Sequence, residues 1–232
     1  MDPKLYKSAM LGNTILLKEI IEEADQLDLL LQLTPQNNTA LHIVAKHGHC
    51  DFASELLRKS PALLFQPNSD GDLPLHLATQ GGHKSLVNLF LDSLKKSPPR
   101  ATDLENNGAA SALCRTSNSK GNNVLHDALR CGYEEVAVAL MEFDPSLADS
   151  VNLAGESPLF MASELGQMVA VESIVSSGSS SFSREGSNGR TPLHASVIGG
   201  HLDITRLLIE KLPDLINQVD KWGRNVLHYA AF

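Results

Sequence analysis

A histidine recurs along the chain at a spacing of 34 residues, and this period constrains the fold more than any other feature. The aligned positions are separated by 34, 50, 34, 34 and 34 residues, and they are His42, His76, His126, Phe160, His194 and His228. A Gly or Asn lies five residues before each of them, namely Asn37, Gly71, Gly121, Gly155, Gly189 and Gly223. A second glycine lies six residues after each of the first five histidine positions, and these glycines are Gly48, Gly82, Gly132, Gly166 and Gly200. These coincidences predict a stack of similar units, each packing on its neighbours.

Each recurring residue has a physical reason. The Gly or Asn before the histidine fits a tight turn with positive φ. A polar residue three before the histidine, such as Thr39 or Thr191, can cap a short helix, although Leu73 cannot. The second glycine ends that helix. Apolar residues four, eight and nine positions later predict a second helix with one buried face.

The run Thr191-Pro192-Leu193-His194, followed by Gly200-His201-Leu202-Asp203-Ile204, resembles the ankyrin repeat. The turn Asp220-Lys221-Trp222-Gly223 resembles that repeat's finger, and the resemblance covers nearly the whole chain. It implies an all-α solenoid of stacked helix-turn-helix units with short β-hairpin-like finger turns. Tetratricopeptide repeats share the period but lack a turn glycine followed by a capped Pro-Leu-His start.

The period places the unit boundaries. The expected units are 1–36, 37–70, 71–120, 121–154, 155–188 and 189–222, with a truncated seventh at 223–232. The third unit is 16 residues longer than the period, and we expect the excess within about 92–118 as an inserted loop without helix. The seventh unit lacks its second helix. We therefore expect a fragment of a longer array whose residues from Gly223 onward fray.

Composition narrows the class of protein. Hydrophobic residues make up 42% and aromatic residues 5% of the chain, which predicts a globular protein with an aliphatic core. A net charge of −8 disfavours nucleic acid as a partner. Three cysteines without a C-x-x-C indicate a reducing compartment. The sequence has no secretory signal and no apolar run long enough to cross a bilayer.

The histidines do not predict a metal or catalytic site. His42, His47 and His49 lie close in sequence, but His42 is the repeat histidine, which in ankyrin repeats binds backbone between units. His49 follows a helix-ending glycine, as His83 and His201 do. Because the common catalytic and phosphate-binding motifs are absent, we expect no enzyme activity, cofactor, metal or small-molecule substrate. We interpret Cys131 as a half-buried, inert thiol, with a reactive thiol as the alternative.

The ankyrin resemblance implies that binding uses the finger tips and the exposed side of the first helix in each unit. The candidate partner-binding residues are Asp70, Asp72, Lys120, Arg130, Glu156, Glu164, Arg190, Lys221, Trp222 and Arg224. Their charges alternate along the stack, which suits a polypeptide better than a phosphate backbone. The alternative is a merely solvated face. Trp222, the only tryptophan, is either a binding hot spot or a residue that packs on the missing part of the seventh unit.

A narrower resemblance is to the plant ankyrin proteins of the accelerated-cell-death type, which have a C-terminal membrane domain. The similar segments are Met1-Asp2-Pro3-Lys4-Leu5-Tyr6, the Pro-x-Leu at 61–63, 145–147 and 213–215, and Gly223-Arg224-Asn225-Val226-Leu227-His228-Tyr229-Ala230-Ala231. This resemblance implies a cytoplasmic scaffold in defence or stress signalling. The parent would lie at the cytosolic face of the plasma membrane, attached through a region that this chain lacks.

Two other classes stay open. The chain can be the substrate-recruiting arm of a kinase, ubiquitin ligase or acyltransferase whose catalytic part is absent. A transcriptional cofactor would need a basic import signal, and Lys95-Lys96 is too short for one. The serine-rich tract at 176–183 is either a solvated connector or a phosphorylation site.

Overall fold

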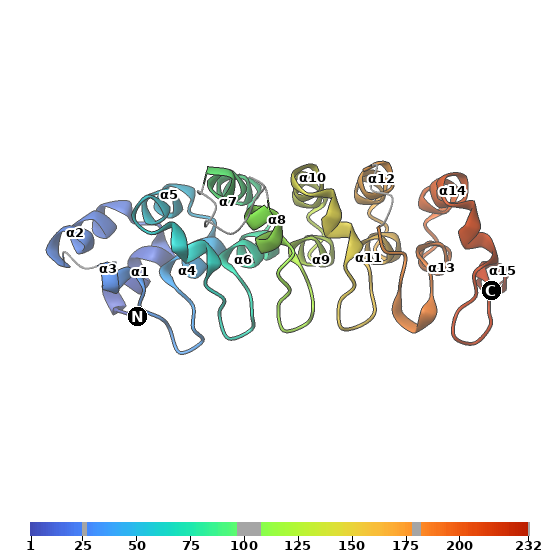
Figure 1. Ribbon diagram of the computed structural model, residues 1–232, viewed down its shortest axis with the longest axis horizontal. Coiled ribbons are helices and arrows are strands. Elements are labelled where there is room, and N and C mark those ends of the chain that lie inside the picture. The colour runs from blue at the N-terminus through green and yellow to red at the C-terminus, as the bar shows by residue number, and fades with distance from the viewer. Residues whose placement is uncertain (25–26, 97–107, 178–181, 232) are drawn as a thin grey trace. The chain divides into compact units, whose positions relative to one another are not determined.

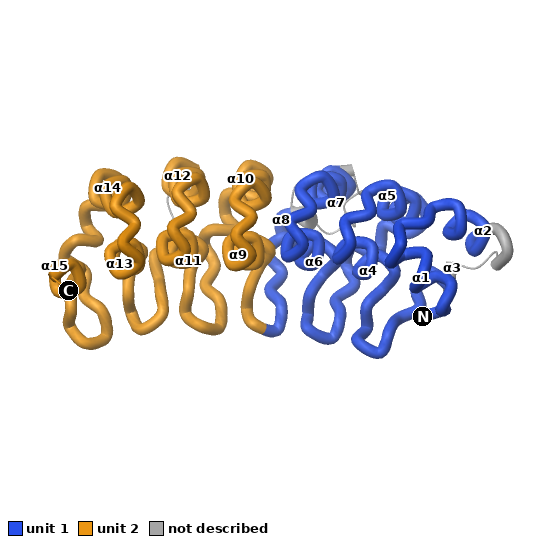
Figure 2. Tube along the Cα trace, turned by 180° about the vertical axis from the view of Figure 1, so that it is seen from behind, with its two compact units in different colours: residues 1–119 blue, residues 120–232 orange. Residues whose placement is uncertain are grey.

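The computed structural model describes residues 1–24, 27–96, 108–177 and 182–231. The chain divides into two compact units, residues 1–119 and 120–232 (Figure 2). From here on, the first unit and the second unit mean these two halves of the chain, each of which contains several repeats. Within each unit, paired helices form two layers, and the turns that join successive pairs project from one edge as fingers (Figure 1). The described residues form α-helices and 3-10 helices and no strands, so the all-α prediction is confirmed.

The first unit has an inner helical layer next to the fingers and an outer layer behind it. The inner helices are α1 (Pro3–Leu11), α4 (Ala40–His47) and α6 (Pro74–Gln80), and the outer helices are α2 (Thr14–Ala24), α5 (Cys50–Lys59) and α7 (Lys84–Lys96). The remaining helices are α3 (Leu27–Leu30), η1 (Pro61–Phe65) and α8 (Gly108–Cys114). Helices of one layer pack on each other, as α1 does on α4 and α4 on α6.

The second unit repeats this arrangement. Its inner helices are α9 (Val124–Arg130), α11 (Pro158–Glu164), α13 (Pro192–Ile198) and α15 (Val226–Ala230). Its outer helices are α10 (Glu134–Phe143), α12 (Met168–Ser176) and α14 (Leu202–Lys211), and its 3-10 helices are η2 (Pro145–Asp149), η3 (Ser187–Gly189) and η4 (Pro213–Asn217). The Pro-x-Leu segments start η1, η2 and η4, where their leucines are buried.

The turn glycines behave as the sequence predicts. All twelve recurring Gly or Asn positions, with Gly12 of the first unit included, have φ between 59° and 79°. Other side chains rarely adopt this left-handed region. At Gly48 a second constraint applies, because an added Cβ would lie 2.6 Å from the His83 ring.

Three of the repeat histidines, His42, His126 and His194, join neighbouring repeats within each half of the chain. His42 Nδ1 accepts the Thr39 N–H at 3.1 Å, and its Nε2–H donates to the Asp72 carbonyl at 3.0 Å. His194 makes the equivalent bond to the Arg224 carbonyl at 3.1 Å. The first bond caps the inner helix and the second holds the next finger, which confirms the architectural role implied by the resemblance.

Phe160 cannot make these bonds, and the chain adapts around it. The Ser157 N–H, which a histidine would accept, donates instead to the Glu185 carbonyl at 2.8 Å. The Phe160 ring fills the space beside Gly186, where an added Cβ would lie 2.0 Å from the ring. We call the fingers at residues 187–190 and 220–224 the sixth and the seventh, after the repeat units that they open. The sixth finger contains the 3-10 helix η3.

The expectation of a non-helical insertion at 92–118 is wrong for residues 92–96 and 108–114, which are helical, whereas residues 115–118 are non-helical as expected. α7 continues to Lys96, and α8 packs on α7 and buries Leu113 and Cys114. The physical reason is composition, because the alanine-rich run Gly108–Cys114 has a high helix propensity. Residues 97–107 of the insertion and 178–181 of the serine-rich tract lie outside the described residues.

Candidate protein-binding surface

An Asn or Asp side chain closes several fingers from within. Its oxygen accepts two backbone N–H groups of the same turn, as Asn152 Oδ1 does from Ala154 at 2.9 Å and Glu156 at 3.0 Å. Asn68 and Asp220 do the same in their fingers. Side chains that bond to nearby backbone in this way favour turns, so each finger holds its shape locally.

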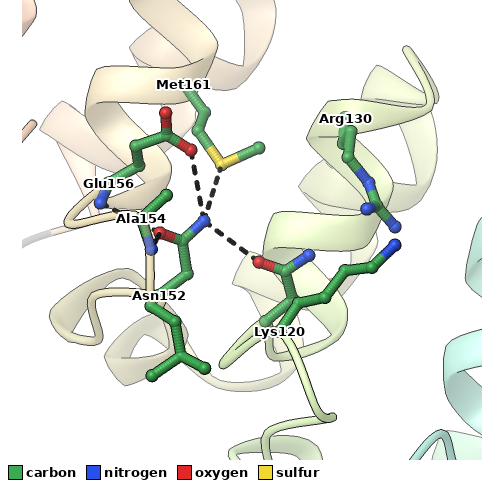
Figure 3. A pocket seen from close by; sticks show the side chains of 8 residues that line it. Lys120, Arg130, Asn152, Ala154, Glu156 and Met161 are labelled. Atoms are coloured by element: carbon green, nitrogen blue, oxygen red, sulfur yellow. Dashed lines mark hydrogen bonds between the residues drawn. The ribbon is translucent and has the colours of Figure 1, made fainter. Parts of the chain in front are cut away.

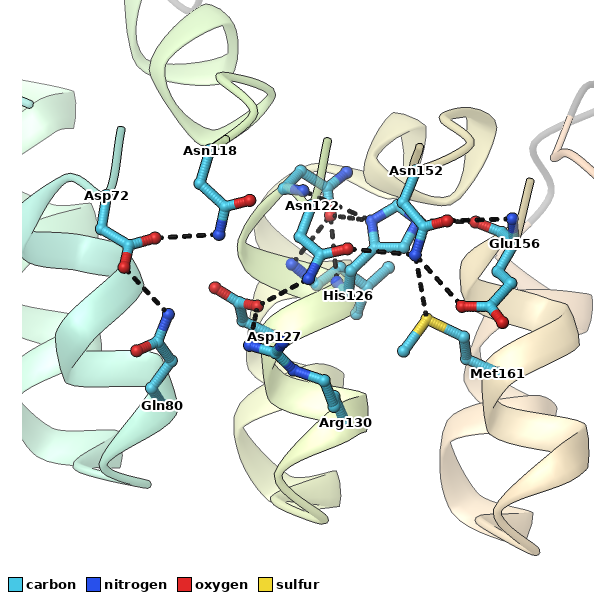
Figure 4. A network of polar contacts seen from close by, with 12 residues as sticks. Asp72, Gln80, Asn118, Asn122, His126, Asp127, Arg130, Asn152, Glu156 and Met161 are labelled. Carbon is cyan, nitrogen blue, oxygen red and sulfur yellow. Dashed lines mark hydrogen bonds and ion pairs between the residues drawn. The ribbon is translucent and has the colours of Figure 1, made fainter. Parts of the chain in front are cut away.

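Neighbouring fingers are also bonded to each other. Asn68 Nδ2 donates to Asn38 Oδ1 at 3.0 Å in the first unit, and Asn152 Nδ2 donates to Asn122 Oδ1 at 3.0 Å in the second (Figure 4). Backbone bonds run beside these contacts, such as Leu153 N–H to the Lys120 carbonyl at 3.1 Å. The finger tips are therefore held at fixed spacing, which lowers the entropy cost of binding across them.

Asp72 was predicted as a partner contact but serves the scaffold. Its side chain is 8% exposed, and its carboxylate accepts Asn118 Nδ2 at 2.8 Å and Gln80 Nε2 at 3.4 Å (Figure 4). Nothing in the local sequence indicates this, because Asn118 is 46 residues away. Asp70, two residues earlier, is exposed at the tip as expected.

A cavity of about 430 Å³ opens between two fingers of the second unit (Figure 3). Its lining residues are Lys120, Asn122, Arg130, Asn152, Leu153, Ala154, Glu156 and Met161. Lys120 and Arg130 lie on one side, and Glu156 and Met161 lie on the other. The sequence predicted both cations and Glu156, but it missed Asn152 and Met161, whose positions depend on the stacking of α9 against α11.

Buried polar groups hold the walls of this cavity. Arg130 donates to Asp127 Oδ1 at 2.7 Å, and the Asp127 side chain is fully buried. The Glu156 carboxylate accepts Asn152 Nδ2 at 3.2 Å. Positive and negative groups are therefore fixed on opposite sides, a pattern that can orient a charged polypeptide.

Glu164 ends α11 and is exposed as predicted. Partial burial raises the pKa of its carboxyl group, the nearby Glu156 adds to the rise, and Arg190 opposes it. Glu164 thus extends the acidic side of this surface along the inner helix.

A second group of predicted residues gathers around Trp222. The Lys221 ammonium lies 4.4 Å from the centroid of the Trp222 ring, and the Arg190 guanidinium lies 5.6 Å from it. Arg190 also lies 5.3 Å from the centroid of the Tyr229 ring. Trp222 remains 52% exposed, and Arg224 is exposed beside it in the same finger.

Asp220 holds this finger through its hydrogen bonds. Oδ1 accepts the N–H groups of Trp222 and Arg224, both at 2.9 Å, and Oδ2 accepts the Tyr229 hydroxyl at 2.5 Å. Burial acts to raise the pKa of Asp220, but these hydrogen bonds prevail and lower it to about 2. The ionised carboxylate therefore stabilises the turn through these hydrogen bonds.

The remaining sequence candidates lie apart from these surfaces. His49, His83 and His201 each place Nε2 at 3.0–3.2 Å from a backbone carbonyl of the preceding repeat, as the structural interpretation predicted. Cys131 is exposed at the end of α9 and not half-buried as expected, because the helix stops before it. Partial desolvation raises the pKa of its thiol, which disfavours the reactive thiolate.

Comparison with known protein families shows which family the chain belongs to. The family model described as ankyrin repeats, in three copies, matches residues 5–103 and 159–232. The chain belongs to the ankyrin-repeat family. The ankyrin fold agrees with the crystal structure of the ankyrin repeat domain of Bcl-3, at a TM-score of 0.78 and 20% identity, covering 99% of this chain and 94% of that one.

Among ankyrin proteins, the whole chain is similar to Protein ACCELERATED CELL DEATH 6 of Arabidopsis thaliana, at 24% identity. It covers 36% of that protein's length. The E3 ubiquitin-protein ligase KEG of Arabidopsis thaliana is 33% identical over 52% of this chain, which covers 7% of that protein. Among the described residues of this ankyrin array, no helix has the length and apolar character needed to cross a membrane.

Proposed function

We propose that this ankyrin array is a non-catalytic protein-binding module and that the cavity between the fingers at 120–122 and 152–156 is part of its binding surface. The observation that carries the proposal is the opposed placement of charge around that cavity, with Lys120 and Arg130 on one side and Glu156 on the other. Ankyrin repeats are typically protein-interaction modules, and a polypeptide can offer both signs of charge at the required spacing.

The rigidity of the surface supports binding without rearrangement. Asn152 links the two fingers through Asn122 and holds its own turn through Glu156. Arg130 is fixed by the buried Asp127. Groups that are already in place need little ordering when a partner arrives, so a modest contact area can give a specific complex.

The similarity to Protein ACCELERATED CELL DEATH 6 supports a narrower role. On that basis the module acts in the cytoplasm, as the cytosolic ankyrin part of a plant defence or stress signalling protein that reaches the membrane through another region. The chain covers 36% of that relative's length, so membrane attachment through a further region is itself part of this proposal.

A second candidate function is favoured by the similarity to the E3 ubiquitin-protein ligase KEG. The array would then select substrates for an enzyme whose catalytic part lies elsewhere in the parent protein. Sequencing the full-length transcript separates the two candidates, because a run of apolar spans supports the membrane-associated role and a catalytic module supports the recruiting arm.

The binding surface can be tested by reversing charge on either side of the cavity. Lys120→Glu and Glu156→Lys are compared with Arg206→Glu and Glu142→Lys, which reverse exposed charges on the outer helices α14 and α10. We expect the two cavity variants to lose the same polypeptides in quantitative affinity purification while their melting temperatures stay close to the parent's. Equal recovery of those polypeptides by all four variants would refute the proposed surface.

The absence of catalysis is tested separately. The purified array is assayed for hydrolase, kinase and transferase activity with general substrates. An activity that disappears in His126→Gln or His194→Gln and persists in Arg206→Glu would contradict the non-catalytic assignment, since both histidines are assigned here to backbone bonds.

A further inference from the structure

The second unit carries a cluster of positive charge around one exposed aromatic ring. We call it the Trp222 patch and define it as Arg190, Lys221, Trp222 and Arg224. Arg190 comes from the sixth finger, and the other three residues come from the seventh. The two fingers are joined by the bond from the Lys221 N–H to the Asn188 carbonyl at 3.1 Å.

The aromatic ring is held in place and left open. The Lys221 ammonium and the Arg190 guanidinium lie 4.4 Å and 5.6 Å from the centroid of the Trp222 ring, within the range of cation–π attraction. Lys221 Nζ also donates to Asn188 Oδ1, a neutral acceptor. With 52% of the tryptophan exposed, the patch offers a large apolar surface with cations beside it.

These cations are not neutralised nearby. Among the residues that the structure describes, Arg190, Lys221 and Arg224 form no ion pair, and the buried Arg190 Nε has no hydrogen-bond acceptor. The nearest candidate carboxylate in the finger, Asp220, is occupied by Tyr229 and two backbone N–H groups. Glu164 acts on Arg190 only at longer range. Three cations beside a single buried carboxylate give this finger a net positive charge, which attracts anions although the whole chain has a net charge of −8.

We propose that the Trp222 patch binds an acidic polypeptide segment that carries an aromatic or large aliphatic side chain. The carboxylates of the segment contact Lys221 and Arg224, Arg190 adds positive charge beside them, and the apolar side chain lies on the exposed indole. The inference rests on the proposed protein-binding function and names the chemistry of one partner segment.

A single-stranded nucleic acid could also stack on an aromatic ring beside cations. A polypeptide is favoured because a nucleic acid needs a continuous positive track for its backbone. Glu164 and Glu156 interrupt that track along the neighbouring inner surface. A nucleic acid is therefore an alternative outcome that the experiment must distinguish.

Trp222 is the only tryptophan of the chain, so its fluorescence reports directly on this patch. The probe is a short synthetic peptide of glutamate and aspartate residues around a central phenylalanine. Its matched controls replace the acids by glutamine and asparagine, or the phenylalanine by glycine, and a thymidine oligonucleotide provides the nucleic-acid control. We expect the acidic aromatic peptide to change the tryptophan emission, with binding that weakens as salt rises. Each peptide control should bind at least about tenfold more weakly, a change of about 1.4 kcal/mol.

Lys221→Glu and Arg224→Glu should each weaken peptide binding by about tenfold, whereas Arg206→Glu should leave it unchanged. Lys221→Gln, which removes the charge without reversing it, should give a smaller loss. Thermal melts check that each variant stays folded. The inference is overturned if the acidic peptide leaves the emission unchanged, if the neutral peptide binds equally well, or if the oligonucleotide binds more tightly than the peptide.

Failure of this inference can be told apart from failure of the proposed function. If the peptide does not bind while Lys120→Glu still loses its polypeptides, the protein-binding function stands and only the Trp222 patch assignment falls. If the peptide binds and the cavity variants lose nothing, the patch stands and the cavity assignment falls.

Discussion

The Nε2 atom of His126 lies 3.1 Å from the backbone carbonyl oxygen of Glu156, and this bond joins one helical pair to the finger of the next. His42 makes the same bond in the first unit, from Nε2 to the Asp72 carbonyl at 3.0 Å. Its Nδ1 accepts the Thr39 N–H at 3.1 Å, so this ring is neutral and carries its proton on Nε2. The array is therefore built on neutral histidines.

This requirement makes the array sensitive to acid. Burial lowers the pKa of His42 and of His126 from 6.5 to about 4, and burial also lowers the pKa of His194. Between about pH 6.5 and about pH 4, His42 and His126 bind protons in the unfolded chain and not in the folded chain. The free energy of unfolding should therefore fall as pH decreases from about 6.5 to about 4, by about 3 kcal/mol for each of the first two histidines.

Urea denaturation at several pH values measures this effect. His126→Gln removes one titrating ring, so the variant should be less stable at neutral pH but should lose less stability on acidification than the parent. A pH dependence identical to the parent's would show that His126 titrates normally in the folded state.

Leu193 should be a principal contributor to stability. Its side chain is fully buried, at 0% exposure, on the inner helix α13. Leu193→Ala should cost about 2–5 kcal/mol of unfolding free energy, because it leaves a cavity that the neighbours cannot fill. Leu202→Ala, at a leucine that is 69% exposed, should change it by less than about 0.5 kcal/mol. Similar losses in the two variants would show that the packing of α13 is misassigned.

Glu134 should stabilise a helix of the following pair. Its Oε2 accepts the Val169 N–H at 3.0 Å and the Ala170 N–H at 3.4 Å, so it caps the first turn of α12. Glu134→Gln should cost about 0.5–1 kcal/mol through the weaker acceptor and the lost charge at a helix N-terminus. Glu172→Gln, in the exposed part of α12, is the matched control and should be nearly neutral. Chemical denaturation compares the two, and equal effects would exclude the cap.

Phe160 and Gly186 should be energetically coupled. Gly186→Ala should destabilise the protein by about 1–3 kcal/mol, because its Cβ would overlap the Phe160 ring and φ at this glycine is not strained. In a Phe160→Ala background the same alanine should cost less, since no ring remains for its Cβ to overlap. A double-mutant cycle from denaturation curves measures the coupling, and additive effects would rule out the clash.

Much of the fold could be predicted from sequence because its rules are local. Positive φ at Gly48 or Gly121, and the cap from Thr191 to the His194 N–H, each follow from a few adjacent residues. The same turn and cap residues recur with the 34-residue period, and this recurrence predicted the helical pairs and the positions of the fingers.

Long-range pairing could not be predicted in the same way. The bond from Asn68 to Asn38 joins residues 30 apart, and only the stacking of the fingers brings them together. Asp72 is the clearest case, because a carboxylate at a turn normally indicates exposure and here is used by Asn118. α8 was missed for another reason, since the turn residues just before it outweighed its alanine-rich run.

Of the candidate surface, the charges were predicted and their grouping was not. Lys120, Arg130 and Glu156 were identified as separate positions on a stripe, whereas the structure places them around one cavity. Arg190 and Trp222 lie 32 residues apart in sequence, and only the pairing of two neighbouring fingers brings them into contact.

The contact between Phe160 and Gly186 also constrains the order in which this sequence could have evolved. A repeat with histidine at position 160 tolerates a side chain at 186, but a repeat with phenylalanine there does not, because any Cβ would lie 2.0 Å from the ring. The glycine must therefore have arisen first or together with the phenylalanine. Among related sequences we expect an aromatic residue at position 160 only where 186 is glycine, while glycine at 186 can accompany histidine. Where the glycine came first, an ancestral array carried glycine at 186 together with the histidine of the repeat, and the unusual sixth finger is what remains of that order.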